Sequence, residues 1–395
     1  MTNTRQQSAD FIVIGAGIGG ASTAYSLAAR ASVIVLERES QPGYHSTGRS
    51  AATFMESYGP AQVRALTRAS LPFFLAPPAG FCDHPLLSPR GALFFASAGQ
   101  QALLDEYEAV ARAGSPGARV ERLDAAQTVA FLPVLRPDQL VGAVLENDVY
   151  DIDVDALLQG FLRGARAAGA STVFGVDIAS IVHVDGVWEV TAGDTVYRAP
   201  VLVNAAGAWA DTVAGLAGAA PLGLVPKRRS AFMFTPMDGL VTAHWPLFMD
   251  VEQSFYIKPD AGMLLGSPCN ADPVDAHDVQ AEELDIAIAI DNIERLTTLR
   301  IRRPTHTWAG LRTFAPDGEF VGGFDPRLPG FFWAAGQGGY GIQSAPAAGA
   351  LYAAMLLGDD LTGAALPAGL DLAAIAPARL IDPARLIDSS PAAST

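Results

Sequence analysis

The chain has 395 residues, of which 50% are apolar and 17% charged, and its 26 basic and 41 acidic side chains give a formal net charge of −15. The apolar content excludes a disordered chain, and the length predicts two or three lobes. The acidity argues against a nucleic-acid partner or an anionic membrane surface, because both bind positive charge. Two cysteines exclude a disulfide framework, and the lack of CxxC, HExxH or clustered histidines argues against a metal site.

The start of the chain predicts a strand, a glycine-rich turn, a helix and a second strand. Asp10–Gly15 is β-branched and apolar, as in a buried strand, and the next residues through Gly20 have the spacing G-x-G-x-x-G. A helix is expected through Ala29, followed by a strand over Ser32–Leu36. This order is typical of a dinucleotide-binding unit, and the alternative is a tight turn without a ligand.

Each glycine of this motif has a physical role in such a unit. Gly15 permits the turn, Gly17 lets the backbone approach a pyrophosphate, and Gly20 lets the helix lie close to the strand. The helix N-terminus presents free N–H groups to the phosphates. Glu37 follows the second strand and is expected to bind both ribose hydroxyls, which disfavours NADP and leaves FAD and NAD open.

The same region has an alternative interpretation as a membrane segment. Phe11–Ala29 is an uncharged stretch of 19 residues, and Ala29-Arg30-Ala31 has the form of a cleavage site. The four glycines in the stretch and Asp10 before it argue against a signal peptide or anchor. We therefore expect no transmembrane segment and a cytoplasmic protein, with peripheral association with the inner membrane as an alternative.

The polar loop Gln41–Ala52 favours FAD, because a compact NAD domain usually begins its next helix here. Its side chains at Ser46, Thr47, Arg49 and Ser50 offer donors to a second phosphate and a ring edge. An ordinary surface loop is the alternative.

The middle of the chain predicts a helical cap and a small antiparallel sheet. The expected helices are Leu103–Ala113, Asp124–Leu135 and one that follows Asp151–Asp155 and runs to Ala168, and the expected strands are Thr172–Val176, Ile178–Val184, Val187–Ala192 and Asp194–Arg198. Asp185-Gly186 predicts a tight turn between two of these strands. A nucleotide base is expected to lie against this sheet near Val176.

A second sheet is expected in the C-terminal half. Its strands are Arg229–Thr235, Ser254–Lys258 and Gly262–Leu265, followed by an amphipathic helix over Gln280–Thr298. Gly330–Gln343 again predicts a strand, a glycine-rich turn and a helix, which runs over Ile342–Leu357. The N-terminus of that helix would stabilise negative charge on a reduced flavin ring. After Pro367 we expect one or two helical turns and a frayed end that carries a repeat, Pro377–Asp382 and Pro383–Asp388.

These segments carry a family resemblance. Val201–Trp209 (VLVNAAGAW) looks like the second flavin motif of the glycine oxidase / D-amino acid oxidase superfamily. Together with the first glycine motif, His45–Ala52 and Gly336–Gln343, it makes the chain resemble the FAD-dependent D-arginine dehydrogenases from about Asp10 to Leu357. The resemblance implies an α/β fold with a discontinuous Rossmann-like FAD-binding domain (1–85, 140–222 and 308–395). It implies an α+β substrate domain on an antiparallel sheet (86–139 and 223–307).

The resemblance also implies the residues of the two sites. Non-covalent FAD is expected to contact Gly15, Gly17, Gly20, Glu37, Arg38, Ser46, Thr47, Arg49, Ser50, Ala51, Ala52, Val176, Ala206, Gly207, Trp209, Gly336, Gly338, Gly339, Tyr340, Gly341, Ile342 and Gln343. In the substrate site, Arg229 and Arg312 correspond to a carboxylate clamp, Tyr256 to a carboxylate contact and Tyr58 to a lid. The Gly339 carbonyl would receive the amine, and Gln343 would lie near flavin and substrate.

Single residues in these segments also have simpler interpretations. Because a strand alternates, only one of Arg228 and Arg229 can face inward, and the resemblance selects Arg229. If these residues bind no ligand, the basic triplet at 227–229 is expected to be a solvated face. Arg312 is then expected to form a surface ion pair. Cys269 is expected to be an inert small hydrophobe, with covalent flavin attachment as an unsupported alternative.

The sequence departs from the D-arginine enzymes in the side-chain pocket. Ala92 stands where the family has an acid for the cationic end of the substrate, and Thr53 and Met55 replace a histidine and a threonine. An unpaired cation would be costly there, so neutral or apolar D-amino acids are expected. Glu56 and Asp83 are nearby acids that would restore a cation site, which keeps D-arginine or D-lysine open.

Three functions follow as hypotheses. The first is a D-amino acid dehydrogenase, a monomer or weak dimer, that passes electrons to a quinone or another carrier. The second is an oxidase of the glycine or sarcosine type that uses O2. The third is an FAD-binding module without amine chemistry.

Overall fold

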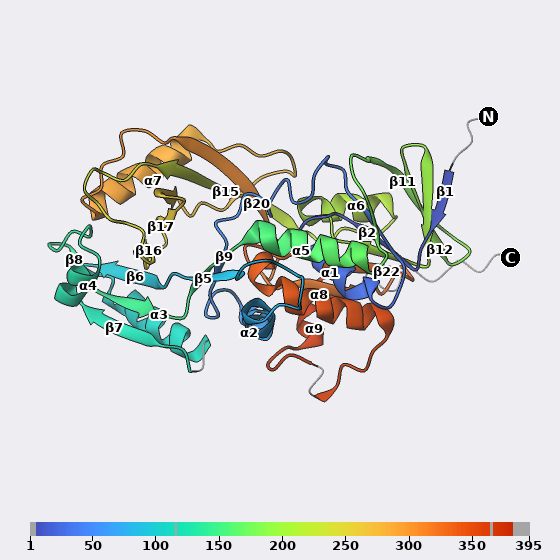
Figure 1. The fold of residues 1–395 in the computed structure, drawn as a ribbon, viewed down its shortest axis with the longest axis horizontal. Helices are drawn as coiled ribbons and strands as arrows, with labels where there is room; N and C mark the ends of the chain where they lie inside the picture. The colour runs from blue at the N-terminus through green and yellow to red at the C-terminus, as the bar shows by residue number, and fades with distance from the viewer. Residues whose placement is uncertain (1–4, 115–116, 364–365, 382–395) are drawn as a thin grey trace.

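The computed structural model describes residues 5–114, 117–363 and 366–381, which form two lobes side by side (Figure 1). The first lobe is built on a six-stranded sheet in the order β10 (Ser171–Val173), β3 (Val33–Leu36), β2 (Phe11–Ile14), β14 (Val201–Asn204), β22 (Phe331–Ala335) and β21 (Val321–Phe324). All neighbours pair in parallel except β21, which is antiparallel to β22. The central strands are apolar throughout because both faces of the sheet are covered.

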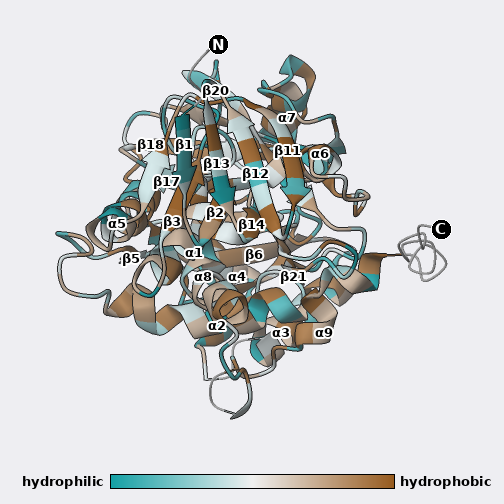
Figure 2. Cartoon of the chain, turned by 90° about the vertical axis from the view of Figure 1, so that its right-hand side faces the viewer, coloured by the Kyte–Doolittle hydropathy of each residue, from teal (hydrophilic) through white to brown (hydrophobic). Residues whose placement is uncertain are grey.

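Alternate residues of these strands face two different layers. Val13 and Val35 face the helices, which are α1 (Ile18–Ala28), α2 (Ala61–Leu75), α5 (Val154–Ala167) and α8 (Gly341–Leu357). Ile12 and Ile34 face the opposite layer, together with Trp188. That layer is a four-stranded sheet in the order β1 (Arg5–Ser8), β13 (Thr195–Ala199), β12 (Val187–Ala192) and β11 (Ile178–Val184), which Figure 2 shows from outside. The first lobe is therefore a three-layer α/β/β unit.

The second lobe is built on a nine-stranded, mostly antiparallel sheet. Its order is β19 (Asp272–Pro273), β15 (Val225–Phe234), β18 (Met263–Ser267), β17 (Tyr256–Asp260), β16 (Leu247–Asp250), β6 (Ala92–Ser97), β8 (Leu140–Glu146) and β7 (Val120–Asp124), and β20 (His306–Phe314) also pairs with β15. One face packs on α7 (Glu283–Leu296), through core residues such as Phe232 and Ile293. The helices α3 (Gln101–Gly114) and α4 (Ala125–Phe131) cover the end formed by β6, β7 and β8.

A short three-stranded sheet lies between the lobes. It has the order β4 (Thr53–Phe54), β9 (Tyr150–Ile152) and β5 (Leu87–Pro89), and β5 and β9 mark this junction in Figure 1. The expected division into 1–85, 140–222 and 308–395 against 86–139 and 223–307 stays a prediction. The strand pairing places β8 and β20 in the nine-stranded sheet, although β8 and all of β20 from residue 308 onward lie within the segments expected for the first domain.

The predicted fold class is confirmed. One lobe has a mostly parallel sheet whose strands come from separate segments of the chain, and the other has a largely antiparallel sheet. The segment weighed as a membrane span forms β2, the glycine turn and α1, and none of the described helices is long and apolar enough to cross a bilayer. Asp185 and Gly186 both have positive φ angles, as expected for the tight turn.

Several element boundaries differ from the predictions. The helix expected over Asp124–Leu135 ends at Phe131, because Pro133 disfavours a helical conformation at Leu132. The helix expected over Gln280–Thr298 is shorter, Glu283–Leu296. Two further elements follow the expected tail start, α9 (Leu372–Ile375) and a 3-10 turn (Pro377–Leu380), and residues 382–388 of the repeat lie outside the described residues.

The helices α1 and α8 cross at close range, and this contact sets the separation of their N-termini. A Cβ atom added at Gly349 in α8 would lie 2.6 Å from the backbone of Ser22 in α1. The crossing therefore requires glycine at this position.

We predict that Gly349→Ala lowers the free energy of unfolding by about 1–3 kcal/mol, because the added methyl group forces the two backbones apart. The control is Gly215→Ala in α6 (Ala210–Leu216), where an added Cβ meets no atom within 4 Å. That change is expected to be neutral or to stabilise by about 0.5–1 kcal/mol. Thermal and urea unfolding measure both, and equal effects of the two substitutions would contradict the close crossing.

Candidate active site

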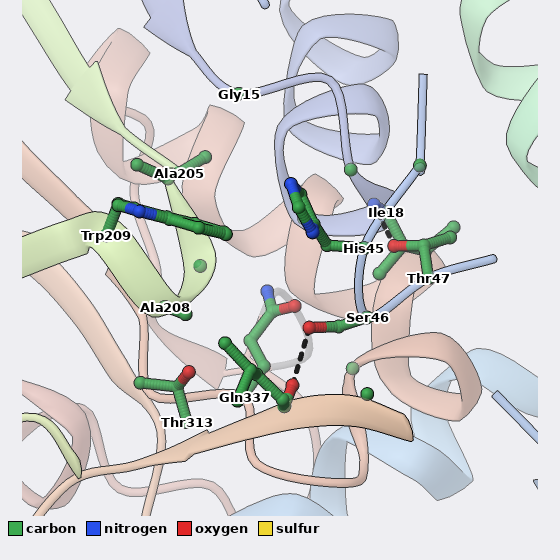
Figure 3. A pocket seen from close by; sticks show the side chains of 18 of the residues that line it. Gly15, Ile18, His45, Ser46, Thr47, Ala205, Ala208, Trp209, Thr313 and Gln337 are labelled. Carbon is green, nitrogen blue, oxygen red and sulfur yellow. Dashed lines mark hydrogen bonds between the residues drawn. The ribbon is translucent and has the colours of Figure 1, made fainter. Parts of the chain in front are cut away.

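A cavity of about 380 Å³ lies where the two lobes meet. Its lining comes from the N-termini of α1 and α8, the loop at 43–51, the β14–α6 connection and strands β15, β17 and β20. Figure 3 shows part of it, with Trp209 and His45 on one side and Thr313 and Gln337 on another. Segments far apart in the sequence therefore surround one elongated site.

The first glycine turn opens onto this cavity. Gly15 has a φ of +104°, and a Cβ there would lie 2.5 Å from the carbonyl oxygen of Ala205. Gly17 lines the cavity at the start of α1. Gly20 does not line it, because it faces the turn, where a Cβ would lie 1.9 Å from the Gly15 carbonyl oxygen. The turn at Gly15 and the close packing at Gly20 follow the spacing, and the contact of Gly17 with a pyrophosphate stays a prediction.

Glu37 fixes the turn and faces the cavity. Its Oε2 accepts a 2.7 Å hydrogen bond from the Ala16 N–H, and its Oε1 accepts one of 2.9 Å from the Glu39 N–H. Nearby, the Arg38 guanidinium lies 4.4 Å above the Trp209 ring. Val176, Ala206 and Gly207 line the same end, as expected for the nucleotide part of a cofactor.

The side chains of the loop expected to offer donors form hydrogen bonds mainly with other segments of the protein. Thr47 Oγ1 accepts from the Ile18 N–H at 3.1 Å, and Ser46 donates to the Leu311 carbonyl (Figure 3). The Arg49 guanidinium binds Asp278 and the carbonyls of Val279 and Ala309. Arg49 therefore ties the loop to the second lobe, and its predicted contact with the cofactor remains untested.

The remaining residues of this loop lie at different depths. Ser50 and Ala51 line the cavity, whereas Ala52 is buried behind it. The Ser50 hydroxyl accepts a hydrogen bond from the Ala52 N–H. At Ser50 and Ala51 the loop therefore presents small side chains to the cavity.

The second glycine turn lies next to the first, since a Cβ added at Gly19 would lie 2.7 Å from Nε2 of Gln337. Gly336, Gly338, Gly339, Gly341 and Ile342 line the cavity at the start of α8. Two of the predicted residues point elsewhere: Tyr340 packs against Tyr58, with ring centroids 4.9 Å apart, and Gln343 is buried. Gln343 accepts from the Met55 N–H and donates to Thr67, so its side chain holds the Met55 backbone.

Two guanidinium groups face the cavity from neighbouring strands. Arg229 in β15 donates from Nε to the Asn270 carbonyl at 2.6 Å, and Arg312 in β20 donates to the Tyr58 hydroxyl at 3.3 Å. Neither pairs with a carboxylate of the described residues. Burial, and then the nearby Arg312, lower the pKa of Arg229. The two cations therefore form a site for an anion.

Gly339 brings the second glycine turn directly against this pair. A Cβ added there would lie 2.9 Å from Cζ of Arg312, so only glycine lets the turn and the guanidinium approach each other. Tyr256, which is buried, lines the cavity on the other side. The carboxylate clamp, the tyrosine and the glycine backbone that the resemblance implied are therefore brought together at one end of the cavity.

Arg228 points to the opposite face of β15, as the strand alternation predicted. It is 8% exposed and pairs with Asp272, Glu282 and Asp285. Asp285 also accepts from the side chain of Asn270, whose carbonyl holds Arg229. A network on the outer face of the sheet thus positions the inner arginine.

The residues expected around the substrate side chain pack beside Tyr256 and not in the cavity itself. Met55 and Ala92 belong to a buried apolar cluster with Tyr256, and Thr53 lies in β4. Of the two acids considered, Asp83 is exposed, and Glu56 is partly buried, which raises its pKa. The acid closest to Ala92 by strand pairing is Glu146, which the sequence did not single out.

Other lining residues were also missed. Thr313 and Gln337 line the cavity next to predicted residues, and Gly338 donates from its N–H to the Thr313 carbonyl at 2.8 Å. Gln337 lay inside the glycine motif, but nothing in the motif showed which way its side chain points. Among the residues that the structure describes, no group of His, Cys, Asp and Glu side chains is arranged to hold a metal ion.

The cavity fits a flavin dinucleotide on its own geometry. Two helix N-termini open onto it, and each favours negative charge, one for a pyrophosphate and one for a ring that gains charge on reduction. The glycines at 15 and 17 leave room for close approach, and Glu37 retains acceptor capacity for ribose hydroxyls. The clamp then lies at the end of the site beside the second helix.

Comparisons with known proteins agree with this geometry. The model of the DAO family, described as FAD dependent oxidoreductase, matches residues 10–355. Human mitochondrial sarcosine dehydrogenase is 27% identical over 362 residues, which cover 85% of this chain and 38% of that protein. N-methyl-L-tryptophan oxidase of Salmonella newport (strain SL254) is 26% identical over 382 residues, covering 88% of this chain and 95% of the relative.

A solved structure shows the same fold. Glycine oxidase from Geobacillus kaustophilus matches with a TM-score of 0.80 at 21% identity, over 95% of this chain and all of that one. The family match covers both glycine turns, the loop between them and both arginines. The chain belongs to the DAO family of FAD-dependent oxidoreductases, and its cofactor is FAD.

Proposed function

We propose that this chain oxidises D-amino acids to imino acids, which hydrolyse in water to 2-oxo acids and ammonia. The observation that carries the proposal is the pair Arg229 and Arg312, two cations without a carboxylate partner among the described residues, at the second helix N-terminus. An amino acid supplies the missing carboxylate and an oxidisable Cα–N bond. The amine-oxidising names of the relatives support the same class of chemistry.

FAD, held without a covalent bond, supplies a hydride acceptor at its N5 atom. Arg229 and Arg312 bind the carboxylate, with bidentate geometry available to each guanidinium. The Gly339 carbonyl accepts a hydrogen bond from the amine and orients its lone pair, and Tyr58 closes over the clamp. Positioning of Cα is then the main contribution of these residues to the rate.

The side-chain preference is proposed from the pocket wall. Ala92, Met55 and Leu247 present apolar surface beside Tyr256, and no acid stands at the Ala92 position. An arginine or lysine side chain would lose hydration there without gaining a charge partner at that position. We therefore infer a preference for neutral or apolar D-amino acids over cationic ones.

The identity of the electron acceptor distinguishes the proposed dehydrogenase from a second candidate function, an oxidase. A quinone or another carrier would make the enzyme a dehydrogenase, as in the D-arginine enzymes that the chain resembles. An oxidase of the glycine or sarcosine type is favoured by the likeness to N-methyl-L-tryptophan oxidase. We propose the dehydrogenase, acting as a cytoplasmic monomer or weak dimer without a nucleic-acid partner.

The first test is anaerobic mixing of the holoenzyme with both enantiomers of Arg, Lys, Met, Leu, Phe and Pro. We expect loss of oxidised-flavin absorbance with neutral D-amino acids and little with L-enantiomers. A carrier but not O2 should then reoxidise the flavin without peroxide, whereas stoichiometric peroxide would indicate the oxidase. A flavin that no amino acid reduces would leave only the FAD-binding module.

We predict that Arg229→Met and Arg312→Met each lower kcat/KM by about ten- to hundredfold, mainly through KM. A charge-assisted hydrogen bond is worth about 1.5–3 kcal/mol, and each 1.4 kcal/mol is about tenfold. Exposed Arg303→Met serves as the control for loss of one positive charge. Near-normal KM values in both clamp variants would remove the clamp from the mechanism.

We predict that kcat/KM rises with pH and then reaches a plateau, because a hydride can leave Cα only when the amine is neutral and its lone pair is free. Burial raises the pKa of the Cys269 thiol to about 11. Burial, and then Tyr58, raise the pKa of Tyr340 to about 12. Neither group loses its proton below pH 10, so neither should produce a falling limb. A bell-shaped profile between pH 6 and 10 would contradict this assignment.

A further inference from the structure

A buried carboxyl group lies one strand beyond Ala92, outside the site described above. Glu146 in β8 is 4% exposed, and its backbone pairs directly with that of Ala92 in β6. Residues paired across antiparallel strands project to the same face of a sheet, with Cα atoms roughly 4.5–5.5 Å apart. Glu146 and Ala92 therefore project to the same side.

That side of the sheet is the one that carries the substrate site. Leu247 pairs with Ala92 from the other neighbouring strand, and both pack in one buried cluster with Met55 and Tyr256. Tyr256 in turn lines the cavity with the two arginines. A path of apolar side chains thus runs from the clamp, past Ala92, toward Glu146.

The carboxyl group is held in place by two hydroxyls. Its Oε1 accepts hydrogen bonds from Ser57, at 3.0 Å, and from Tyr107. Tyr107 is fixed by stacking on Phe94, with ring centroids 3.9 Å apart. Ser57 directly precedes Tyr58, whose hydroxyl contacts the clamp through Arg312. The acid and the lid therefore belong to one local structure.

The second carboxyl oxygen has no protein partner. Among the described residues, Oε2 of Glu146 accepts no hydrogen bond, and no lysine or arginine pairs with the group. Both hydroxyl contacts of this 4% exposed residue are on Oε1, so Oε2 keeps its acceptor capacity for a further donor. Burial raises the pKa of Glu146, which agrees with the lack of a nearby cation.

We propose that Glu146 forms the polar end of the substrate side-chain pocket and selects neutral side chains that end in a hydrogen-bond donor. This rests on the proposed amino acid oxidation and refines its substrate class. An amide N–H at the end of a short apolar stem would pass Ala92 and donate to Oε2. A lysine ammonium suits the site less well, because its other N–H groups would face Met55, Leu247 and Phe94.

Adaptable packing permits such a side chain to enter. The cavity ends at Tyr256, and the residues between it and Glu146 are packed against one another. Met55 is an unbranched, flexible part of this packing and can change rotamer to admit a ligand. Ala92, the strand neighbour of Glu146, contributes only a methyl group to this cluster.

The test uses isosteric substrate pairs on the holoenzyme. D-glutamine and D-methionine have similar shape, and only the amide has a terminal donor; D-asparagine and D-leucine form a second pair. We expect Glu146→Met to lower the ratio of kcat/KM for the amide over its apolar partner about tenfold, through KM. D-methionine turnover should be kept.

A second variant protects the test against misfolding. Ser57→Ala/Tyr107→Phe/Glu146→Met removes the two hydroxyls that the single change would leave without an acceptor, and replacing all partners of a buried network together is nearly neutral. The matched control is Glu56→Gln, which removes the neighbouring partly buried acid and should leave the ratio unchanged.

Each outcome is decisive. If the flavin of these variants is still reduced by D-methionine and the ratio of kcat/KM for amide over apolar substrate is unchanged, Glu146 is a structural group and the inference is overturned. A change with Glu56→Gln instead would assign the selection to Glu56 and also overturn it. If no D-amino acid reduces the wild-type flavin, the proposed function fails, which is distinguishable because it needs no variant.

Discussion

The central constraint on this molecule is that two guanidinium groups face one cavity without a protein carboxylate among the described residues. Burial, and then the like charge of Arg312, lower the pKa of Arg229, so the charged form of this arginine is costly while the site is empty. Binding an anion relieves this cost. A zwitterionic amino acid meets this requirement and at the same time brings its Cα to the flavin end of the cavity, so binding energy is converted into position.

The rest of the fold maintains that arrangement. On the outer face of β15, Arg228 satisfies three acids, and Asp285 among them holds Asn270, which holds Arg229. On the inner side, Gly339 lets the second glycine turn touch Arg312. The close crossing of α1 and α8 at Gly349 fixes the distance between the two helix N-termini that serve the cofactor. Stability and function therefore share the same contacts.

The sequence predicted what depends on local pattern. Short-range rules predict the glycine turn at Gly15 and the strand alternation that separates Arg228 from Arg229. They also predict the strand, turn and helix that run from Gly330 through Ile342, and the structure has all three features. It did not predict what depends on pairing across the sheet. Glu146 is distant in sequence from Ala92 and becomes its neighbour only through the β6–β8 register, and Gln343 turned out to hold the Met55 backbone.

The account is tested most directly by binding a carboxylate that cannot react. Titrating the oxidised holoenzyme with a 2-oxo acid and with its neutral amide, while following the flavin spectrum, separates charge from shape. The account predicts saturable binding of the acid, no binding of the amide at the same concentrations, and loss of acid binding in Arg229→Met and Arg312→Met. Equal binding of acid and amide, or unchanged acid binding in both variants, would contradict it.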